Sequence, residues 1–431
     1  MGSLATGQVV AEVDGNESVY RISLDQRSRY EVLSGQFRAG GTGGDQVAAF
    51  RTLLRFDADW DPVGIVTEMM DSRQALADMG SALNTSTVDA FAVLQAHAVW
   101  RPHPGHQIRL GRMTRDLGSR RLVARNRYRN TLNSFTGAHW MWDPMESPLS
   151  AEAFYWLPVQ RLPTDLPSLL GNEIARDEES FRRQFWGLVF RHSGMPWRTH
   201  LAASYFGLHE EPDWGLSRQL QTLALRWHRP QSEGSVDFEL EAALQWGRSR
   251  LAAAGPDLDP LASFAHASAG YTFEMPWKPR LGFAIDYASG DSNPADGRNG
   301  RFDTLFGARR FEYGPTGIYG AIARGNLISP EVRLTAKPTQ SVSFTIAHRG
   351  VWLESAKDAW TSAGVADPTG NSGHHVGQQV EARVRWRPEH KRFEIAVGVA
   401  HLFTGSFLDR APNASRQGDT TYGYAQTTLR F

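Results

Sequence analysis

The chain contains no cysteine at any of its 431 positions. This absence excludes a disulfide scaffold, a cysteine-ligated metal site and a thiol nucleophile. Net charge is absent as well, because 46 Lys and Arg residues balance 46 Asp and Glu residues. A general nucleic-acid binder is usually basic overall, so this balance disfavours that class and we predict no nucleic-acid partner.

Long hydrophobic runs are also missing. No stretch approaches the roughly 20 apolar residues that a membrane helix needs. The three-four spacing of an amphipathic helix is scarce, and residues 165–185 are the best place for a short one. The chain opens MGSLATG, without a signal peptide, as expected of a processed mature start. No G-x-S-x-G, H-E-x-x-H or P-loop pattern occurs, so we predict no catalytic residue, no resident metal and no cofactor.

What the chain does have is a repeated alternation of apolar and polar residues, the period of a strand with two different faces. In residues 50–60, Phe50 and Leu54 fall on one face, and Arg51 and Arg55 fall on the other. The same alternation recurs in residues 236–247 and 393–403. Strands of this kind, repeated to the end of the chain, predict an all-β protein.

The connections between these strands alternate between short and long. Short turns marked by Pro or Gly occur at 61–62, 101–105, 144–148, 193–196, 230–234, 275–279, 337–340 and 387–391. Longer polar connections occur at 28–47, 72–86, 114–133, 161–180, 210–216, 250–260, 291–325, 354–375 and 405–420. This predicts a transmembrane antiparallel β-barrel of about 18 strands, with short periplasmic turns and long extracellular loops. We expect residues 1–18 to be a flexible segment and residues 19–431 to be a single barrel domain.

A soluble all-β fold, such as a large sandwich or a propeller, alternates residues in the same way. Strands of about ten residues suit a tilted bilayer crossing better than a globular sheet. Charge along the second face could not be buried in a sandwich core. The chain also ends on an aromatic residue, Phe431, like the sorting signal of outer-membrane barrels. Aromatic residues gather at strand ends, where a membrane-interface girdle would lie, at Trp60, Trp100, Trp227, Trp246, Trp352, Trp386 and Phe403. We therefore expect a bacterial outer-membrane location.

Residues 111–133, GRMTRDLGSRRLVARNRYRNTLN, concentrate positive charge inside this neutral chain. The segment contains one acid, Asp116, and seven arginines, Arg112, Arg115, Arg120, Arg121, Arg125, Arg127 and Arg129. It falls at the long-loop end of the predicted barrel. Because few acids lie nearby in sequence, we favour a functional role in which this loop enters the lumen and binds an anionic solute.

If the apolar faces meet lipid, the charged faces line the lumen. Besides the seven arginines above, the candidate pore-lining residues are Arg51, Arg55, Arg183, Arg226, Arg333, Arg383, Arg385, Asp57, Glu239 and Glu241. Arg191, Arg198, Arg218 and Arg349 are also predicted to point inwards, with Asp59, Asp237, Asp286, Glu331, Glu381 and Glu394. Arginines and acids that share the lumen have two interpretations. They can form ion pairs that stiffen the barrel wall, or they can lie on opposite sides of the pore and create a transverse electric field that selects anions. For any single inward arginine we favour the ion pair.

Residues 64–187 resemble the alginate export family of outer-membrane barrels. The runs that carry the resemblance are DSRQALADMGSALNTSTVDAFAVLQA, IRLGRMTRDLGSRRLVARNRYRNTLNSFTG and LPVQRLPTDLPSLLGNEI. It implies an eighteen-stranded monomeric barrel with an arginine-rich constriction that attracts a polyuronate. Gly111-Arg112 keeps the Gly-Arg pair of the exporter's corresponding strand, and Arg115 falls near its second arginine. The match to this broad family does not fix the polymer.

The main hypothesis is an outer-membrane channel that exports an anionic, alginate-like polysaccharide or lets it diffuse. The alternative with the same architecture is a substrate-selective porin for uptake of small anions or saccharides. An outer-membrane enzyme would need a nucleophile and a base on the wall, and a soluble carbohydrate-binding protein is the remaining rival. The expected partners are an anionic polysaccharide or sugar solute, outer-membrane lipid and, for export, periplasmic proteins.

Two weaker motifs could suggest a metal site. Residues 290–300 resemble a calcium loop without its glutamate, and we interpret His374-His375 as a solvated pair.

Overall fold

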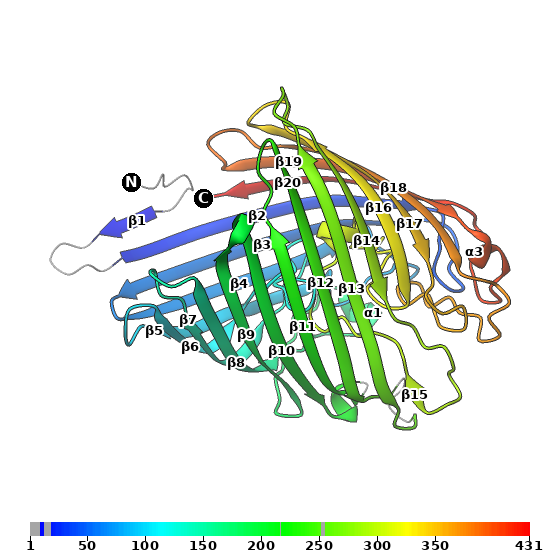
Figure 1. Cartoon of the computed structure of the whole chain (residues 1–431), viewed down its shortest axis with the longest axis horizontal. Coiled ribbons are helices and arrows are strands. Elements are labelled where there is room, and N and C mark those ends of the chain that lie inside the picture. The colour runs from blue at the N-terminus through cyan, green and yellow to red at the C-terminus, as the bar shows by residue number, and fades with distance from the viewer. Residues whose placement is uncertain (1–8, 13–18, 216, 251–254) are drawn as a thin grey trace.

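The computed structural model describes residues 9–12, 19–215, 217–250 and 255–431 (Figure 1). Eighteen antiparallel strands pair in chain order, and the last pairs with the first to close a barrel. The barrel strands are β2 (Val19–Ser34), β3 (Asp45–Trp60), β4 (Val63–Ala75), β5 (Asp89–Trp100), β6 (His106–Met113), β7 (Phe135–Trp142), β8 (Leu149–Pro158), β9 (Arg183–Met195), β10 (Thr199–Glu210), β11 (Gln219–Arg229), β12 (Ser235–Arg248), β13 (Asp259–Thr272), β14 (Arg280–Ala288), β16 (Leu327–Ala336), β17 (Val342–Trp352), β18 (His375–Trp386), β19 (Phe393–Thr404) and β20 (Thr420–Arg430). The predicted fold class is confirmed.

Two further strands lie outside this ring. β1 (Val9–Glu12) pairs with the first residues of β2, and β15 (Arg298–Asn299) pairs with the start of β13. The flexible segment predicted for residues 1–18 lies outside the described residues, apart from β1.

Helical segments are short. They are α1 (Leu166–Leu170), α2 (Arg310–Tyr313), α3 (Ser406–Arg410) and the 3₁₀ turns η1 (Pro196–Arg198) and η2 (Pro212–Trp214). α1 lies inside the predicted range 165–185 and begins at Asp165, whose side chain accepts a hydrogen bond from the Ser168 N–H at 3.0 Å. Among the described residues, no helix is long and apolar enough to cross a membrane.

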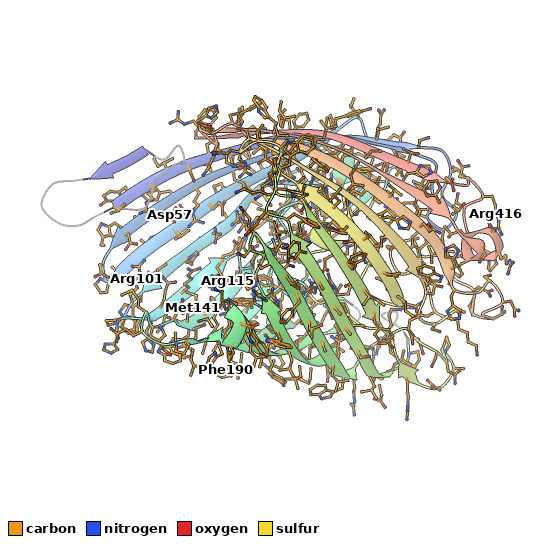
Figure 2. All side chains as sticks on the ribbon, turned by 45° about the horizontal axis from the view of Figure 1, so that its top comes forward. Asp57, Arg101, Arg115, Met141, Phe190 and Arg416 are labelled. Carbon is orange, nitrogen blue, oxygen red and sulfur yellow. The ribbon has the colours of Figure 1, made fainter. Side chains whose placement is uncertain are left out.

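The two ends of the barrel differ as the alternation of connections predicts. The turn end carries the short links, from residues 61–62 between β3 and β4 to residues 387–392 between β18 and β19. The loop end carries the long links and α3, and Figure 1 shows the C-terminus at the opposite, turn end. Figure 2 shows Arg101 and Asp57 near the turn end and Arg416 at the loop end.

The strands present their apolar side chains to the outside. In β3, Phe50 and Leu54 are 40% and 50% exposed, whereas Arg51 between them is 6% exposed. Such an apolar exterior is stable in lipid rather than in water. Arg198 does not follow its predicted inward direction, because it lies exposed in the η1 turn, beyond the strand alternation that the prediction relied on.

The hydrophobic core lies inside the barrel, where two long loops enter the lumen and pack on each other. We call residues 114–134 the first inner loop and residues 289–326 the second inner loop. The N–H of Phe306 donates to the carbonyl of Leu122 at 2.9 Å, and the N–H of Ala124 donates to the carbonyl of Phe306 at 3.1 Å. The Phe306 ring also meets the wall residue Phe135 edge to face, with centroids 5.3 Å apart. The paired loops therefore form a partition across the lumen.

Candidate functional site

Arginines of the barrel wall hold the first inner loop in place. Arg27 on β2 donates to the carbonyls of Arg127 and Tyr128, each at 3.0 Å, and of Arg129 at 2.8 Å. Arg51 on β3 donates to the carbonyls of Arg127 and Arg129, each at 3.1 Å. These bonds satisfy loop carbonyls that no strand pairs. The basic segment therefore lies inside the lumen, where we expected the loop to enter.

Arg121 fastens the same loop to the opposite wall. Its guanidinium pairs with Glu239 at 2.5 Å and Glu241 at 2.6 Å, both on β12, and also with Glu312 of the second inner loop. The Arg121 side chain is 2% exposed. A fully desolvated arginine with three carboxylates is held in one geometry, so Arg121 has a structural environment.

Acids compensate most of the remaining cluster, and all of them except Asp116 come from outside the segment. The further ion pairs are Arg112 with Glu179, Arg115 with Glu152 at 2.9 Å, Arg125 with Glu68 at 2.7 Å and Arg127 with Asp116 at 3.2 Å. Arg120 stacks instead over the Phe311 ring at 4.7 Å. Arg129 forms no ion pair with any described residue. The scarcity of nearby acids in the sequence therefore does not describe the charge balance of the folded protein.

The second inner loop is anchored to β18 and to itself. Arg310 in α2 pairs with Glu381 at 2.6 Å, and the Tyr319 hydroxyl donates to the side-chain oxygen of Gln379 at 2.8 Å. Arg324 pairs with Glu312 at 2.5 Å. The loop therefore crosses the lumen with Arg310, Glu312 and Arg324 already paired.

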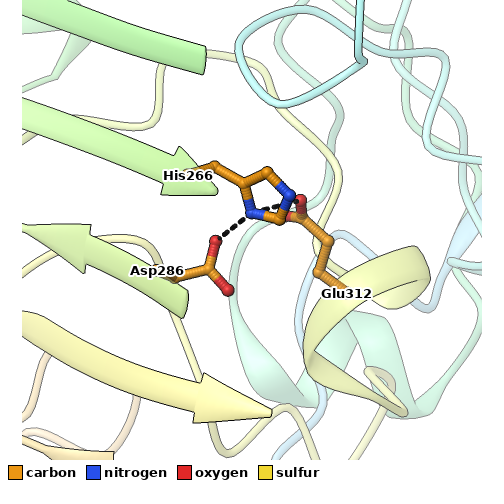
Figure 3. A group of neighbouring side chains, drawn as sticks. All are labelled: His266, Asp286 and Glu312. Atoms are coloured by element: carbon orange, nitrogen blue, oxygen red, sulfur yellow. Dashed lines mark hydrogen bonds and ion pairs between the residues drawn. The ribbon is translucent and has the colours of Figure 1, made fainter. Parts of the chain in front are cut away.

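A buried cluster of His266, Asp286 and Glu312 joins this loop to the wall (Figure 3). The His266 Nδ1 atom lies 2.7 Å from an Asp286 oxygen and 3.8 Å from a Glu312 oxygen. Arg349 pairs with Asp286 at 2.8 Å, and Glu312 is shared by two arginines as described above. Guanidinium groups already neutralise both carboxylates, so this chemistry suits a structural junction rather than a cation site.

On the loop side of the partition lies a cavity of about 590 Å³, which we call the loop-side cavity. Its charged lining consists of one acid, Asp303, and seven arginines, Arg38, Arg129, Arg161, Arg218, Arg301, Arg309 and Arg324. Within the described part of the chain, Arg38, Arg129, Arg161 and Arg309 form no ion pair. Burial, followed by the charge of neighbouring arginines, lowers the pKa of Arg129 to about 9 and that of Arg309 to about 10. This excess of desolvated positive charge would be relieved by a bound anion.

On the turn side lies a second cavity of about 550 Å³, the turn-side cavity. Its charged lining consists of four acids, Asp25, Asp116, Glu381 and Glu394, and eleven arginines, Arg27, Arg51, Arg120, Arg125, Arg127, Arg310, Arg333, Arg383, Arg385, Arg387 and Arg430. Among the described residues, Arg27, Arg120, Arg383 and Arg385 form no ion pair with an acid. Positive charge therefore exceeds negative charge on both sides of the partition.

The remaining predicted residues divide into two groups. Arg55, Asp57 and Arg115 line a cavity of about 420 Å³ that also borders Arg125 and Arg127 (Arg115 is labelled in Figure 2). Arg183 and Arg226 are engaged by acids of neighbouring strands, Arg183 by Glu210 at 2.5 Å and Arg226 by Glu239 at 2.7 Å. These two arginines line none of the three cavities described above.

The partition presents neighbouring residues to opposite sides. In the second inner loop, Arg309 lines the loop-side cavity and the next residue, Arg310, lines the turn-side cavity. In the first inner loop, Arg129 lines the loop-side cavity, and Arg127 lines the turn-side cavity. On each loop, arginines that line the two cavities are therefore one or two residues apart in sequence.

Sequence reasoning missed several of these arginines. Arg38, Arg161 and Arg309 lie in long connections, where no alternation assigns a direction to a side chain. Arg27 lies on β2, in a strand whose pattern we did not recognise. The Arg309-Arg310 doublet is the one visible signal, since it is a second local concentration of charge in a long connection.

The family model described as "Alginate export" matches residues 20–420. The match covers nearly all of the barrel, including both inner loops. No curated protein sequence matches the chain.

Solved structures of outer-membrane proteins share the fold. OpdK of Pseudomonas aeruginosa superposes with a TM-score of 0.63 at 12% identity, covering 96% of this chain and 98% of that one. OccAB1 of Acinetobacter baumannii gives 0.61 at 12% identity, covering 100% and 99%. OpdK with vanillate gives 0.60 at 12% identity, covering 95% and 98%. At such identities the likeness establishes the fold, which is that of an outer-membrane channel.

Proposed function

Because the chain belongs to the alginate export family of outer-membrane barrels, we propose that it is a channel for carboxylate-bearing solutes, in particular small organic anions or short uronate oligomers. The observation that supports this proposal best is the excess of arginine on both sides of the partition. The loop-side cavity has seven arginines to one acid, and the turn-side cavity has eleven to four, in a chain with no net charge.

Arginine suits this solute class because its planar guanidinium binds a carboxylate through two parallel hydrogen bonds. The four loop-side arginines without ion pairs still have N–H donors for a ligand; Arg309, for example, has a single side-chain hydrogen bond, from Nη1 to the carbonyl of Ile322 at 3.2 Å. A solute carboxylate entering the cavity would offset charge that the protein leaves uncompensated. It would then pass from Arg129 and Arg309 to Arg127, Arg310 and the arginines of β18.

The partition favours small solutes over a polymer. Both inner loops are bonded to the walls through buried ion pairs, and the cavities on either side hold about 590 and 550 Å³. A small carboxylate can move between two such cavities when a few side chains shift. Vanillate, seen in one of the structurally similar proteins, is an anion of that size.

The test is ion and solute selectivity in reconstituted membranes. In a planar bilayer with a salt gradient, we expect a reversal potential that indicates anion preference. In liposomes, we expect glucuronate to enter faster than glucose, which has nearly the same size but no charge. A cation preference of the unmodified protein would contradict the proposal.

Export of a polyuronate is the second candidate function, and the family match over residues 20–420 favours it. A polymer needs a continuous path, so this function requires both inner loops to move away from the walls together. A disulfide between the first inner loop and β3 distinguishes the two candidates, because the chain has no other cysteine. We expect the oxidised protein, with one cysteine introduced on each of these two segments, to keep glucuronate permeation. Loss of all permeation on oxidation, restored on reduction, would favour export.

A further inference from the structure

Two histidines face each other across neighbouring strands at the turn end of the barrel. His200 on β10 lies directly opposite His228 on β11, and their rings stack with centroids 5.1 Å apart and planes inclined by 24°. Leu201, next to His200 in the chain, is 41% exposed on the lipid-facing side. Because successive residues of a strand point to opposite faces, both histidines point into the lumen. Both side chains are partly exposed, so ions in the lumen can reach them.

The ring nitrogens of this pair are unused. Neither imidazole forms a hydrogen bond or an ion pair with any described residue, and the His228 Nδ1 atom is buried without a partner. Two other lumen histidines are engaged, His266 by Asp286 at 2.7 Å and His139 by Glu152 at 2.8 Å. A buried polar atom without a partner costs free energy, which a ligand to that atom would recover.

A carboxylate follows on the next strand. Glu239 on β12 lies directly opposite His228, on the side away from β10. Its Oε1 atom accepts a hydrogen bond from the Arg226 Nε atom at 2.7 Å and pairs with Arg121 at 2.5 Å. Its Oε2 atom receives no hydrogen bond within the described part of the chain. Two imidazoles and one free carboxylate oxygen therefore lie in a row across β10, β11 and β12.

We propose that His200, His228 and Glu239 bind one divalent transition metal of the zinc type at the turn end of the lumen. Imidazole nitrogens and carboxylate oxygens are zinc ligands, and three protein ligands leave a fourth position to water. Directly opposite residues of antiparallel strands have Cβ atoms about 5 Å apart, which suits two ligands about 2 Å from one metal once the rings turn out of their stack. Calcium is disfavoured because its ligands are oxygen atoms.

A metal at this position would join three strands of the wall. It would also reach the anchor of the first inner loop, since Glu239 is one of the acids that hold Arg121. We expected no resident metal because no metal-binding motif occurs in the sequence. The proposed site has no such motif, because its ligands belong to three strands and meet only through strand register. They line none of the three lumen cavities, so the inference does not depend on the solute.

The experiment is zinc binding to the full chain in detergent micelles, without a polyhistidine tag, measured by titration calorimetry with ZnCl₂. We expect one site per chain and a higher unfolding temperature with zinc than without it. His200→Ala and His228→Ala should each weaken binding by at least about tenfold, since even the loss of a group that only orients a ligand costs about that much. His228→Phe keeps a flat ring in the wall without a ligand nitrogen and should weaken binding equally.

The matched control is His103→Ala. His103 and His106 form another ring pair at the turn end, with centroids 6.4 Å apart, but the His106 Nδ1 atom already accepts from the Trp140 Nε1 atom at 3.2 Å. This variant should bind zinc like the unmodified protein. The inference is overturned if the unmodified protein takes up no zinc, or if His200→Ala and His228→Ala bind zinc normally. It is also overturned if His103→Ala loses zinc as fully as they do, because exposed histidines in general would then account for the binding.

Discussion

Arg121 and Arg129 belong to the same short basic segment, yet the fold gives them opposite environments. Arg121 has three carboxylate partners, Glu239, Glu241 and Glu312, whereas Arg129 forms no ion pair among the described residues and faces a cavity. Arg121 is buried, and Arg129 is partly buried. The difference separates an arginine that builds the channel from one that is available to a solute. Local density of arginine in a sequence does not make this distinction.

The largest expected effect comes from Arg121→Met. Removing this guanidinium leaves three carboxylates near one another without their shared partner, and breaking a buried ion pair in this way costs about 3–5 kcal/mol. We expect the inner loops to detach, with a lower unfolding temperature and a higher single-channel conductance. Bilayer recordings and thermal unfolding in detergent measure both quantities. Unchanged conductance and stability would mean that Arg121 does not hold the partition.

The next effect comes from replacing both Arg129 and Arg309 by glutamine. Each substitution removes a guanidinium without breaking an ion pair, so we expect stability to stay constant or to rise. Anion preference should fall, and the apparent affinity for glucuronate should weaken about tenfold, or about 1.4 kcal/mol, for each guanidinium that no longer binds the solute carboxylate. Reversal potentials and competition by glucuronate during chloride conduction measure these changes.

Arg218→Gln is the matched control for that pair, because Arg218 lines the same cavity but pairs with Glu210 at 2.6 Å and Asp303 at 2.8 Å. This substitution should lower stability more than anion preference. If it lowers anion preference as much as the Arg129 and Arg309 replacement, unpaired arginines have no special role in the loop-side cavity.

A smaller effect is expected from pH alone. Burial lowers the pKa of Arg129 to about 9 and that of Arg309 to about 10, so these side chains are cationic at neutral pH and lose their protons as pH rises through those values. Anion preference should therefore decline as pH rises from about 8 to 11. Reversal potentials across that range measure the decline, and the protein with glutamine at both positions should show less of it. An equal decline in both proteins would assign the titration to other groups.

Arg127→Gln is expected to have the smallest effect. Arg127 pairs with Asp116 at 3.2 Å, but its side chain is 68% exposed. A solvated pair of this kind contributes between zero and about 1 kcal/mol. The unfolding temperature should match that of the unmodified protein within error. A large loss of stability would show that exposure does not divide structural from dispensable arginines in this segment.

Much of the barrel could be predicted from sequence because its constraints are local. Strand alternation, as in residues 50–60, records which face meets lipid, and the turns at residues 61–62 and 101–105 mark where strands end. A short helix was expected somewhere in residues 165–185, and α1 occupies only Leu166–Leu170 of that range. The inner loops could be located as long connections, but their paths could not be predicted, since loops lack the periodicity that assigns side-chain direction.

The candidate site was predictable only in part, for the same reason. Arg383 and Arg385 alternate on β18 and line the turn-side cavity. Arg38, Arg161 and Arg309 lie in loops and went unrecognised. The partners of Arg121 come from positions more than 100 residues away, so the sequence gives no sign that this arginine is neutralised.

The sequence by itself determined the barrel, the number of its strands and the end at which the long loops lie, because a lipid-facing strand must alternate at every second residue. Only the tertiary structure decided that two of those loops fold inwards and meet. It also decided which arginines remain without an acid, because that depends on carboxylates brought together from different strands. In the segment 111–133, charge is a property of the sequence, whereas its availability to a solute is a property of the fold.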